Sequence, residues 1–302
     1  MPLSFSQLAA FRAVADAGSV GRGAAKLLVS QPAVSKHIRQ LERTLGVTLF
    51  DRTPKGVRLT QAGEVLAGYA RRIFMLADET ERAVADVRGL KTGRLAIAAS
   101  PTLGVYFLPE LLVRFRRKFP GVTLVVEIEN SNVLQRRLLD GDVELGFSEV
   151  QPPQREIESH VFMHDQLIAI ASPRHALAKK RSIALAALCA EPFVVRETGS
   201  TSKSMVERAL AERGLTIRPA MSLGSTEAIK HAVSAGVGVA VISRLAAAPD
   251  LARRRLVQLK VNGLALRRPL YRMSMRGRRQ SAAAGAFLEL VSHAAHASRS
   301  SM

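Results

Sequence analysis

Apolar residues recur at helical spacing three times near the start of the chain. The three stripes are Leu8, Phe11, Val14 and Ala15; Ala24, Ala25, Leu27 and Leu28; and Val34, Ile38, Leu41 and Leu45. Ser4 with Gln7 forms a capping box, Ser19 and Ser30 supply two further N-caps, and Pro32 suits a first helical turn. A turn at residues 28–30 separates the second and third helices. The pattern therefore predicts a helix-turn-helix.

A short polar-apolar alternation and then a long helical repeat follow. Residues 47–50 and 57–59 are β-prone and flank a turn at residues 53–56, which predicts a β-hairpin wing. Thr60 can cap a helix that continues to about residue 88. Its apolar positions, in steps of four and three, are Ala62, Leu66, Tyr69, Ile73, Leu76, Thr80, Ala83, Val87 and Leu90. This spacing favours a dimerising coiled coil, and the alternative is a long helix packed on its own domain.

Beyond Gly93, strand-like runs alternate with amphipathic helices. Strands are predicted at residues 95–99, 122–128, 143–147, 167–171, 193–195 and 237–242, and helices at 108–119, 134–139, 205–213 and 228–234. Residues 270–275 and 283–290 are expected to return to the first of two lobes. The alternation predicts an α/β fold with parallel sheets in both lobes.

The net charge of the chain predicts an anionic partner. The 302 residues carry a formal net charge of +19, of which residues 1–91 contribute +6, residues 92–252 contribute +3 and residues 253–302 contribute +10. Such an excess favours nucleic acid. The basic C-terminal fifty residues are either a solvated surface or an auxiliary contact to bent DNA. No secretory signal or membrane-length apolar run is visible, which predicts a cytoplasmic protein without a membrane partner.

The third helix begins with uncharged donors and becomes cationic afterwards. Gln31 and Ser35 suit hydrogen bonds to base edges in the major groove, where Pro32 can pack on a thymine methyl group. Lys36 can reach a base or a phosphate, and Arg39, further along, suits a phosphate. These properties predict the recognition helix of a protein that binds double-stranded DNA.

The wing carries charge that suits contact to the DNA backbone or the minor groove. Arg52, Lys55 and Arg58 lie on or beside its turn. Without the wing and the long helix, the same pattern would fit a generic three-helix domain with a basic face. The candidate DNA-binding residues are Gln31, Pro32, Ser35, Lys36, Arg39, Arg52 and Lys55.

Residues 19–45, followed by LFDRTPKGVRLTQAGE, resemble the DNA-binding half of a LysR-type transcriptional regulator, and the resemblance extends over the whole chain. It implies a winged helix-turn-helix domain (residues 1–59), a dimerising linker helix (60–91) and a two-lobed, periplasmic-binding-protein-like α/β effector domain (92–302). Lobe one would comprise about residues 92–163 and 268–292, and lobe two about 164–267. The family also implies a homodimer or homotetramer on an inverted-repeat operator. The two glycines of Gly21-Arg22-Gly23 depart from the family pattern and are expected to loosen the second helix.

Three hydroxyl-rich segments lie between predicted strands and helices. They contain Ser100 and Thr102; Ser200, Thr201 and Ser202; and Thr226. Helix N-termini beyond the carboxyl ends of strands bind anions in open α/β folds, although each segment alone also fits a simple helix cap. Together they predict a cleft for a small carboxylate- or phosphate-bearing metabolite, held by neutral donors without a carboxylate cluster or a cofactor.

The segment that contains these residues most resembles the regulators of the Calvin cycle and of cysteine biosynthesis. That subgroup often has G-S-G-T-R where this chain has Gly199-Ser200-Thr201-Ser202-Lys203. Hydroxyl donors are kept, but a point charge replaces a fork-shaped guanidinium.

Catalytic and metal sites are not predicted. His160 and His164 have no third ligand nearby in the sequence, Gly236-Val237-Gly238 precedes a strand instead of a helix, and Cys189 lacks a nucleophile motif. The competing hypothesis is a solute-binding or enzymatic α/β domain fused to a DNA anchor. Turnover of a metabolite would favour that hypothesis, whereas ligand-modulated DNA binding without turnover would favour a regulator.

Overall fold

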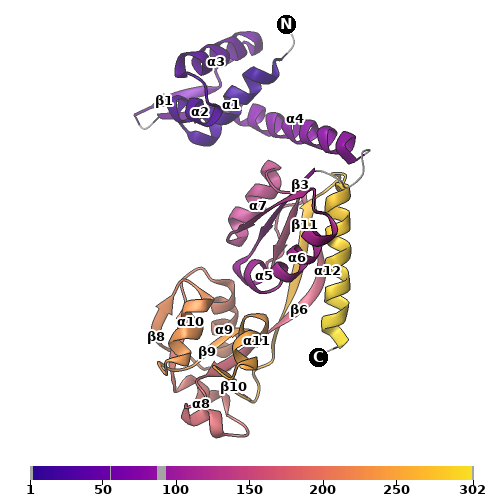
Figure 1. The fold of residues 1–302 in the computed structure, drawn as a ribbon. Helices are drawn as coiled ribbons and strands as arrows, with labels where there is room; N and C mark the ends of the chain where they lie inside the picture. The colour runs from indigo at the N-terminus through magenta and orange to yellow at the C-terminus, as the bar shows by residue number, and fades with distance from the viewer. Residues whose placement is uncertain (1–2, 55, 87–92, 301–302) are drawn as a thin grey trace. The chain divides into compact units, whose positions relative to one another are not determined.

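The computed structural model describes residues 3–54, 56–86 and 93–300 of the chain. The chain divides into two compact units, Met1–Val84 and Ala85–Met302 (Figure 1). The first unit is helical with a small hairpin, and the second is a mixed α/β structure. The predicted fold class, an N-terminal helical winged helix-turn-helix followed by a two-lobed α/β region, is confirmed.

The first unit contains the predicted helix-turn-helix, wing and long helix. Its elements are α1 (Phe5–Ala17), α2 (Val20–Leu27), α3 (Gln31–Leu45), β1 (Phe50–Thr53), β2 (Gly56–Leu59) and α4 (Gln61–Asp86). The Ser30 Oγ accepts the Ala33 N–H at 3.4 Å, and the Thr60 Oγ1 accepts the Gly63 N–H at 3.0 Å. The Ser4 and Ser19 side chains make no capping hydrogen bond, so the predicted capping box at Ser4 is wrong.

The segment Gly21-Arg22-Gly23 departs from the family pattern, and packing explains the glycine at position 23. A Cβ atom on Gly23 would lie 2.8 Å from Val14 Cγ2 and 3.0 Å from Val14 Cα, so α1 and α2 cross too closely for any side chain there. The helix starts at Val20 and includes both glycines. Gly23 therefore allows the close crossing of α1 and α2, and the expected loosening of α2 stays a prediction.

The second unit alternates strands and helices as predicted, with additional elements. They are β3 (Gly93–Ala99), α5 (Pro101–Tyr106), α6 (Leu108–Lys118), β4 (Val122–Ile128), α7 (Ser131–Asp140), β5 (Leu145–Ser148), β6 (Ile157–Ala171), η1 (Ala176–Lys179), α8 (Leu185–Cys189), β7 (Pro192–Arg196), α9 (Thr201–Ala211), β8 (Arg218–Leu223), α10 (Thr226–Ser234), β9 (Ala240–Ser243), α11 (Arg244–Ala252), β10 (Val257–Gln258), β11 (Leu266–Met275) and α12 (Ala282–Ser300).

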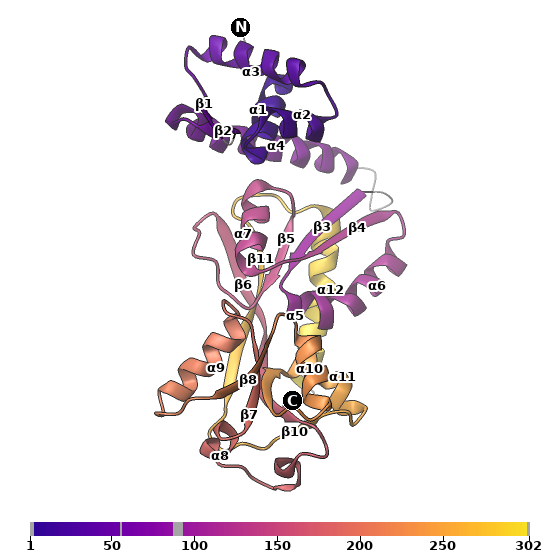
Figure 2. The ribbon, with the colours of Figure 1, turned by 90° about the vertical axis from the view of Figure 1, so that its left-hand side faces the viewer.

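The main sheet has the strand order β10-β6-β11-β5-β3-β4, with β9 also paired to β6. Strands β3, β4 and β5 are parallel, as are β7 and β8 of a second sheet. The expectation of wholly parallel sheets is wrong, because β6 pairs antiparallel with β9, β10 and β11. Strands β6 and β11 run from one lobe to the other, so two strands connect the lobes (Figure 2).

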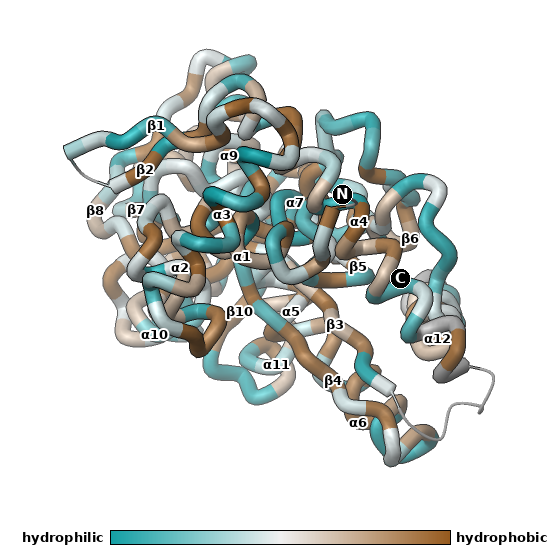
Figure 3. The backbone as a smooth tube through the Cα atoms, turned by 90° about the horizontal axis from the view of Figure 1, so that it is seen from above, coloured by the Kyte–Doolittle hydropathy of each residue, from teal (hydrophilic) through white to brown (hydrophobic). Residues whose placement is uncertain are grey.

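Each lobe buries an apolar core of its own. In lobe one, β3, β4, α6 and the returning helix α12 enclose Phe115, Phe147 and Phe287. Figure 3 shows how the hydrophobic residues follow the neighbouring strands β3 and β4. In lobe two, Ile170, Val194 and other buried residues pack beneath α10 and α11. These cores hold rigid the loops at the carboxyl ends of the parallel strands, where the polar residues gather.

Candidate functional site

Helix α3 presents one polar face to solvent and buries the other. Val34, Ile38 and Leu41 are buried, whereas Gln31 and Pro32 at its start are exposed. On the same solvent side, Lys36 and Arg39 are exposed and Ser35 is half-buried. The predicted base-reading and phosphate-contacting residues of this helix therefore share one accessible surface.

The predicted wing is a four-residue-by-four-residue antiparallel hairpin. Arg52 on β1 pairs with Val57 on β2, and Asp51 pairs with Arg58. Both arginines are exposed. Lys55, the other wing residue predicted to contact DNA, lies outside the described residues.

Helix α4 has two apolar faces, which the 4-3 repeat does not separate. Ala62, Leu66 and Ile73 pack against the core of the first unit. Tyr69 and Leu76 are 60% and 64% exposed. The predicted seam thus divides: some positions belong to the unit's own core, and others remain available to a second chain. Of the remaining seam positions, Val87 and Leu90 lie outside the described residues.

The second unit encloses a cavity of about 550 Å³ between its lobes. Its wall is made by the loops that follow β3, β4, β5, β7 and β8, together with Arg268 on β11. The lining residues are Ser100, Pro101, Thr102, Asn130, Ser131, Asn132, Glu149, Val150, Arg196, Glu197, Thr198, Gly199, Ser200, Thr201, Ser202, Gly224 and Arg268. Five of the six predicted effector-binding residues, all except Thr226, therefore line one cavity.

The hydroxyl-rich segments differ in whether they cap their helices. At α10, the Ser225 Oγ accepts the Ala228 N–H at 3.1 Å, so this segment is a helix cap. Ser100 and Ser200, the N-cap residues of α5 and α9, make no such bond. The buried Ser100 Oγ has no hydrogen-bond partner among the residues that the structure describes, and the Ser200 Oγ lies 3.0 Å from the Ser202 Oγ. Simple capping therefore explains only one of the three segments.

Arg268 supplies a buried positive charge in the lobe-one wall. Its Nε and Nη2 donate to Asp165 Oδ2 at 3.0 and 2.8 Å, and Nη2 lies 3.5 Å from Glu149 Oε1. The Arg268, Asp165 and Glu149 side chains are only 6%, 1% and 7% exposed. Nη2 also reaches Thr102 Oγ1 at 3.5 Å, which links this group to a predicted effector-binding residue.

Arg196 supplies the positive charge of the lobe-two wall. Its Nε and Nη2 donate to the two carboxylate oxygens of Glu197, each at 2.7 Å. Its Nη1 donates to Thr226 Oγ1 at 3.2 Å. Thr226 thus lies behind Arg196, and its hydroxyl orients the guanidinium instead of facing the cavity. The hydrogen bonds from Arg196 lower the pKa of Glu197 below its usual value.

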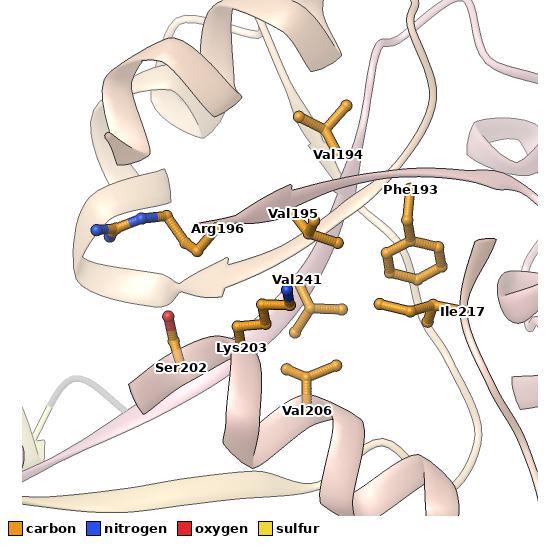
Figure 4. Close-up of a pocket in the computed structure, with 9 residues that line it drawn as sticks. All are labelled: Phe193, Val194, Val195, Arg196, Ser202, Lys203, Val206, Ile217 and Val241. Carbon is orange, nitrogen blue, oxygen red and sulfur yellow. The ribbon is translucent and has the colours of Figure 1, made fainter. Parts of the chain in front are cut away.

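Lys203 does not replace the family's arginine in the large cavity. It lines a smaller, mostly apolar pocket with Phe193, Val206 and Val241, which adjoins the large cavity because Arg196 and Ser202 line both (Figure 4). In the same view, Arg196 extends away from these apolar side chains, toward the side on which the Ser202 hydroxyl lies. The charged donors of the large cavity are therefore Arg196 and Arg268.

The cavity differs from the predicted site in its charges. The sequence predicted neutral donors and no dedicated carboxylate cluster, and two arginines and the carboxylates of Glu149 and Glu197 also line the wall. These charged residues were not predicted, because they form no spacing motif and come from separate parts of the sequence. A signal did exist for Arg196, since it directly precedes the hydroxyl-rich segment after β7.

The residues considered for catalysis lie elsewhere in ordinary surroundings. His160 is exposed on β6, where its Nε2 lies 3.0 Å from Glu158 Oε1. Cys189 is buried, and burial raises the pKa of its thiol. Among the described residues, no group of three or more His, Cys, Asp or Glu side chains has the arrangement of a metal site. No described helix is long and apolar enough to cross a bilayer.

Family models match both units of the chain. Residues 5–64 match the bacterial regulatory helix-turn-helix protein, lysR family, and residues 88–295 match the LysR substrate binding domain. The RuBisCO operon transcriptional regulator of Allochromatium vinosum is 41% identical over 291 residues, which cover 96% of each chain. This relative agrees with the subgroup resemblance read from the sequence.

Two solved structures share the fold. The Synechocystis PCC6803 CcmR regulatory domain in complex with 2-PG is 29% identical and has a TM-score of 0.62, covering 68% of this chain and 98% of that one. Full-length CbnR complexed with its target DNA is 27% identical and has a TM-score of 0.64, covering 97% of this chain and 100% of that one.

Proposed function

The chain belongs to the LysR family of transcriptional regulators, and from this premise we propose that it binds an inverted-repeat operator as a dimer or tetramer under the control of a small anionic metabolite. The observation that carries the effector half of this proposal is the cavity of about 550 Å³, lined by hydroxyl groups and two arginines. Its activity would be binding, without turnover of the metabolite, in the cytoplasm.

The DNA-binding half of the proposal rests on the solvent face of α3. Gln31, Pro32, Ser35 and Lys36 would meet base edges in the major groove, and Arg39 a phosphate. Arg52 and Lys55 of the wing would contact the backbone or the minor groove. The exposure of the described members of this set, and the solved complex of CbnR with its target DNA, support this assignment.

The dimer would form through the outward face of α4. Val65, Tyr69, Leu76 and Val84 are each about 60% exposed, at 59%, 60%, 64% and 62%. Spacings of four, seven and eight residues keep them on neighbouring positions of one helix side. A second α4 would cover this apolar stripe, and further pairing of effector domains would give the tetramer that the family implies.

The effector would bind with its acidic group among Ser100, Thr102, Ser200, Thr201 and Ser202. The first two residues belong to lobe one and the other three to lobe two, so one ligand would contact both lobes. Binding would then favour one arrangement of the lobes and change how the paired chains engage DNA. The CcmR regulatory domain in complex with 2-PG supports a small acid as the ligand class.

The domain limits follow from the same assignment. We place the winged helix-turn-helix at residues 1–59, the dimerising linker at 60–91 and the effector domain at 92–302. The effector domain comprises lobe one, about 92–163 and 268–292, and lobe two, about 164–267. The boundary between the compact units, at Val84 and Ala85, falls within the linker helix.

The proposal is tested by footprinting the purified chain on the intergenic region beside its own gene. We expect protection of an inverted repeat and a change in the footprint when an effector is added. Calorimetry against 2-PG, phosphorylated sugars, sulfur metabolites and aromatic acids would identify the effector first. A chain that converts one of these compounds, or that protects no repeat with any of them, would contradict the proposal.

The dimer has a separate test. The double variant Tyr69→Glu, Leu76→Glu is expected to be monomeric by light scattering and to lose tight binding to the repeat. Leu66 and Ile73 are unsuitable for this test, because charges there would also disrupt the core of the first unit. Ser6→Glu, an exposed position on α1, is the control and is expected to keep the oligomeric state. A folded monomer in the unmodified chain would contradict the dimer.

A further inference from the structure

Arg196 holds the carboxylate of its own neighbour in the chain, Glu197. Both carboxylate oxygens of Glu197 accept from the guanidinium at 2.7 Å, in the two-bond geometry that Arg uses for carboxylates and phosphates. The same guanidinium lines the cavity. An acidic group that enters the cavity therefore meets an arginine whose fork is occupied.

The two partners of this pair are held with very different firmness. The Arg196 side chain is 16% exposed, and two further contacts orient it: Nη1 to Thr226 Oγ1 at 3.2 Å and Nη2 to the Gly224 carbonyl at 3.4 Å. The Glu197 side chain is 44% exposed. Only its main chain is fixed, by the N–H that donates to Leu223 O at 3.2 Å and the carbonyl that accepts from Ser200 N–H at 3.3 Å. Glu197 can therefore rotate into water while Arg196 stays in place.

The other cavity arginine cannot exchange its partner in this way. Asp165 and Glu149, the carboxylates around Arg268, are 1% and 7% exposed. Moving either of them to water would require the wall itself to open, and leaving either unpaired would strand a buried charge. The exchange site is therefore Arg196.

We propose, on the basis of the effector function proposed above, that Glu197 is an internal competitor that sets the affinity of the cavity for acids. A ligand with two acidic oxygens on one group takes the hydrogen bonds from Arg196 Nε and Nη2, and the Glu197 carboxylate returns to solvent. Arg196 keeps its bonds to Thr226 and Gly224. Every ligand that takes this position must first displace the carboxylate, so Glu197 raises the concentration at which the regulator responds.

The test is calorimetry of the full-length chain with two probes: sulfate, which remains a dianion over the whole working range of pH, and 2-PG. Glu197→Gln is expected to lower the dissociation constant about two- to fivefold, since an exposed ion pair contributes little and costs as little to displace. Arg196→Gln is expected to abolish the measurable binding. Adding Glu197→Gln to Arg196→Gln should bring no gain, because the competition exists only at Arg196.

Glu212→Gln is the matched control. Glu212 is an exposed residue at the other end of α9, and its substitution changes the net charge by the same amount. Three results would contradict the role of Glu197 as a competitor. They are equal affinities for the Glu197 and Glu212 variants, weaker binding by Glu197→Gln, and a gain in affinity from Glu197→Gln that persists without Arg196. None of these three results would contradict the assignment of the cavity as the effector site. Failure of both probes to bind the wild type and Glu197→Gln would instead count against the cavity as an anion site and overturn both proposals.

Discussion

The surface of α3 and the wing differs from the cavity between the lobes in how its positive charges are held. Lys36, Arg39 and Arg52 are exposed on α3 and the wing. Arg196 and Arg268 line the cavity, and each already contacts at least one carboxylate. Exposed cations attract any polyanion and are screened by salt. A cation that is paired with a carboxylate attracts other anions only weakly at a distance. It binds only a ligand whose acidic group can match or replace that carboxylate.

This difference suits the two proposed ligands. DNA offers a dense row of phosphates, so surface charge gives affinity while base edges give specificity. A small metabolite must be distinguished from many other cellular anions, and the proposed competition at Arg196 would raise the concentration of acid needed for binding. Substitutions that change only the exposed charges or only the paired charges test this difference.

The largest expected effect is at the buried arginine. Arg268→Met leaves Asp165 and Glu149 without their cation, and loss of one partner of a buried pair costs about 3–5 kcal/mol of unfolding free energy. Scanning calorimetry of the full chain should show this loss in the transition of the effector unit. Arg267→Met, at the exposed neighbouring position on β11, is the control and should cost less than about 0.5 kcal/mol. Equal effects of the two substitutions would refute the buried network.

A smaller effect is expected at the start of the recognition helix. Gln31→Ala should reduce the discrimination between the operator and a scrambled sequence by about 1–3 kcal/mol, the value of one good base contact. Ser35→Ala should act in the same direction. Fluorescence anisotropy on both DNA sequences measures this difference. If Gln31→Ala weakens both sequences equally, Gln31 does not read a base.

The wing should affect affinity without affecting discrimination. Arg52→Ala would remove the proposed phosphate contact, so it should weaken binding to both sequences alike and reduce the slope of log affinity against log salt by about 0.9. Titrations at several salt concentrations provide this slope. An unchanged slope would mean that Arg52 does not reach the DNA.

The smallest expected effect concerns the stability contributed by Glu197. The pKa of Glu197 is lowered by its hydrogen bonds to Arg196, so the pair's contribution is present above the ordinary glutamate pKa of about 4.3 and disappears as pH falls through the lowered pKa. Because the pair is partly exposed, Glu197→Gln should cost less than about 1 kcal/mol. The cost should be the same at about pH 7 and about pH 5 and fade only in stronger acid. A cost that already fades between those two pH values would contradict the lowered pKa.

The exposed face of α3 and the grouping of the hydroxyl-rich segments could be predicted from the sequence. The face of α3 is a local property: Val34, Ile38 and Leu41 define its buried side, so the exposed residues follow from helical periodicity. The hydroxyl-rich segments could be assigned to one cleft because each follows a strand and begins a helix, the position at which open α/β folds bind ligands. Both predictions needed only short segments and a fold class.

The charged residues of the cavity wall could be identified only from the three-dimensional structure. Arg268 looked like one more residue of the basic C-terminal region, yet β11 carries it beside Asp165 of β6. The apolar periodicity also did not distinguish buried from exposed positions on α4, because this helix has two apolar faces. The 4-3 repeat of α4 includes Leu66 against the unit's own core and Leu76 in solvent, and no spacing rule separates them.

The most direct test of the account is the DNA affinity of the full-length chain with and without an effector, in the wild type and in the Thr102→Ala, Ser202→Ala double variant. Anisotropy on the operator should show that the effector changes the affinity of the wild type. The double variant should keep the effector-free affinity but lose most of the response, because one hydroxyl is removed from each lobe's side of the cavity. An effector that binds the double variant unchanged and alters its DNA affinity as in the wild type would contradict the assignment of this cavity.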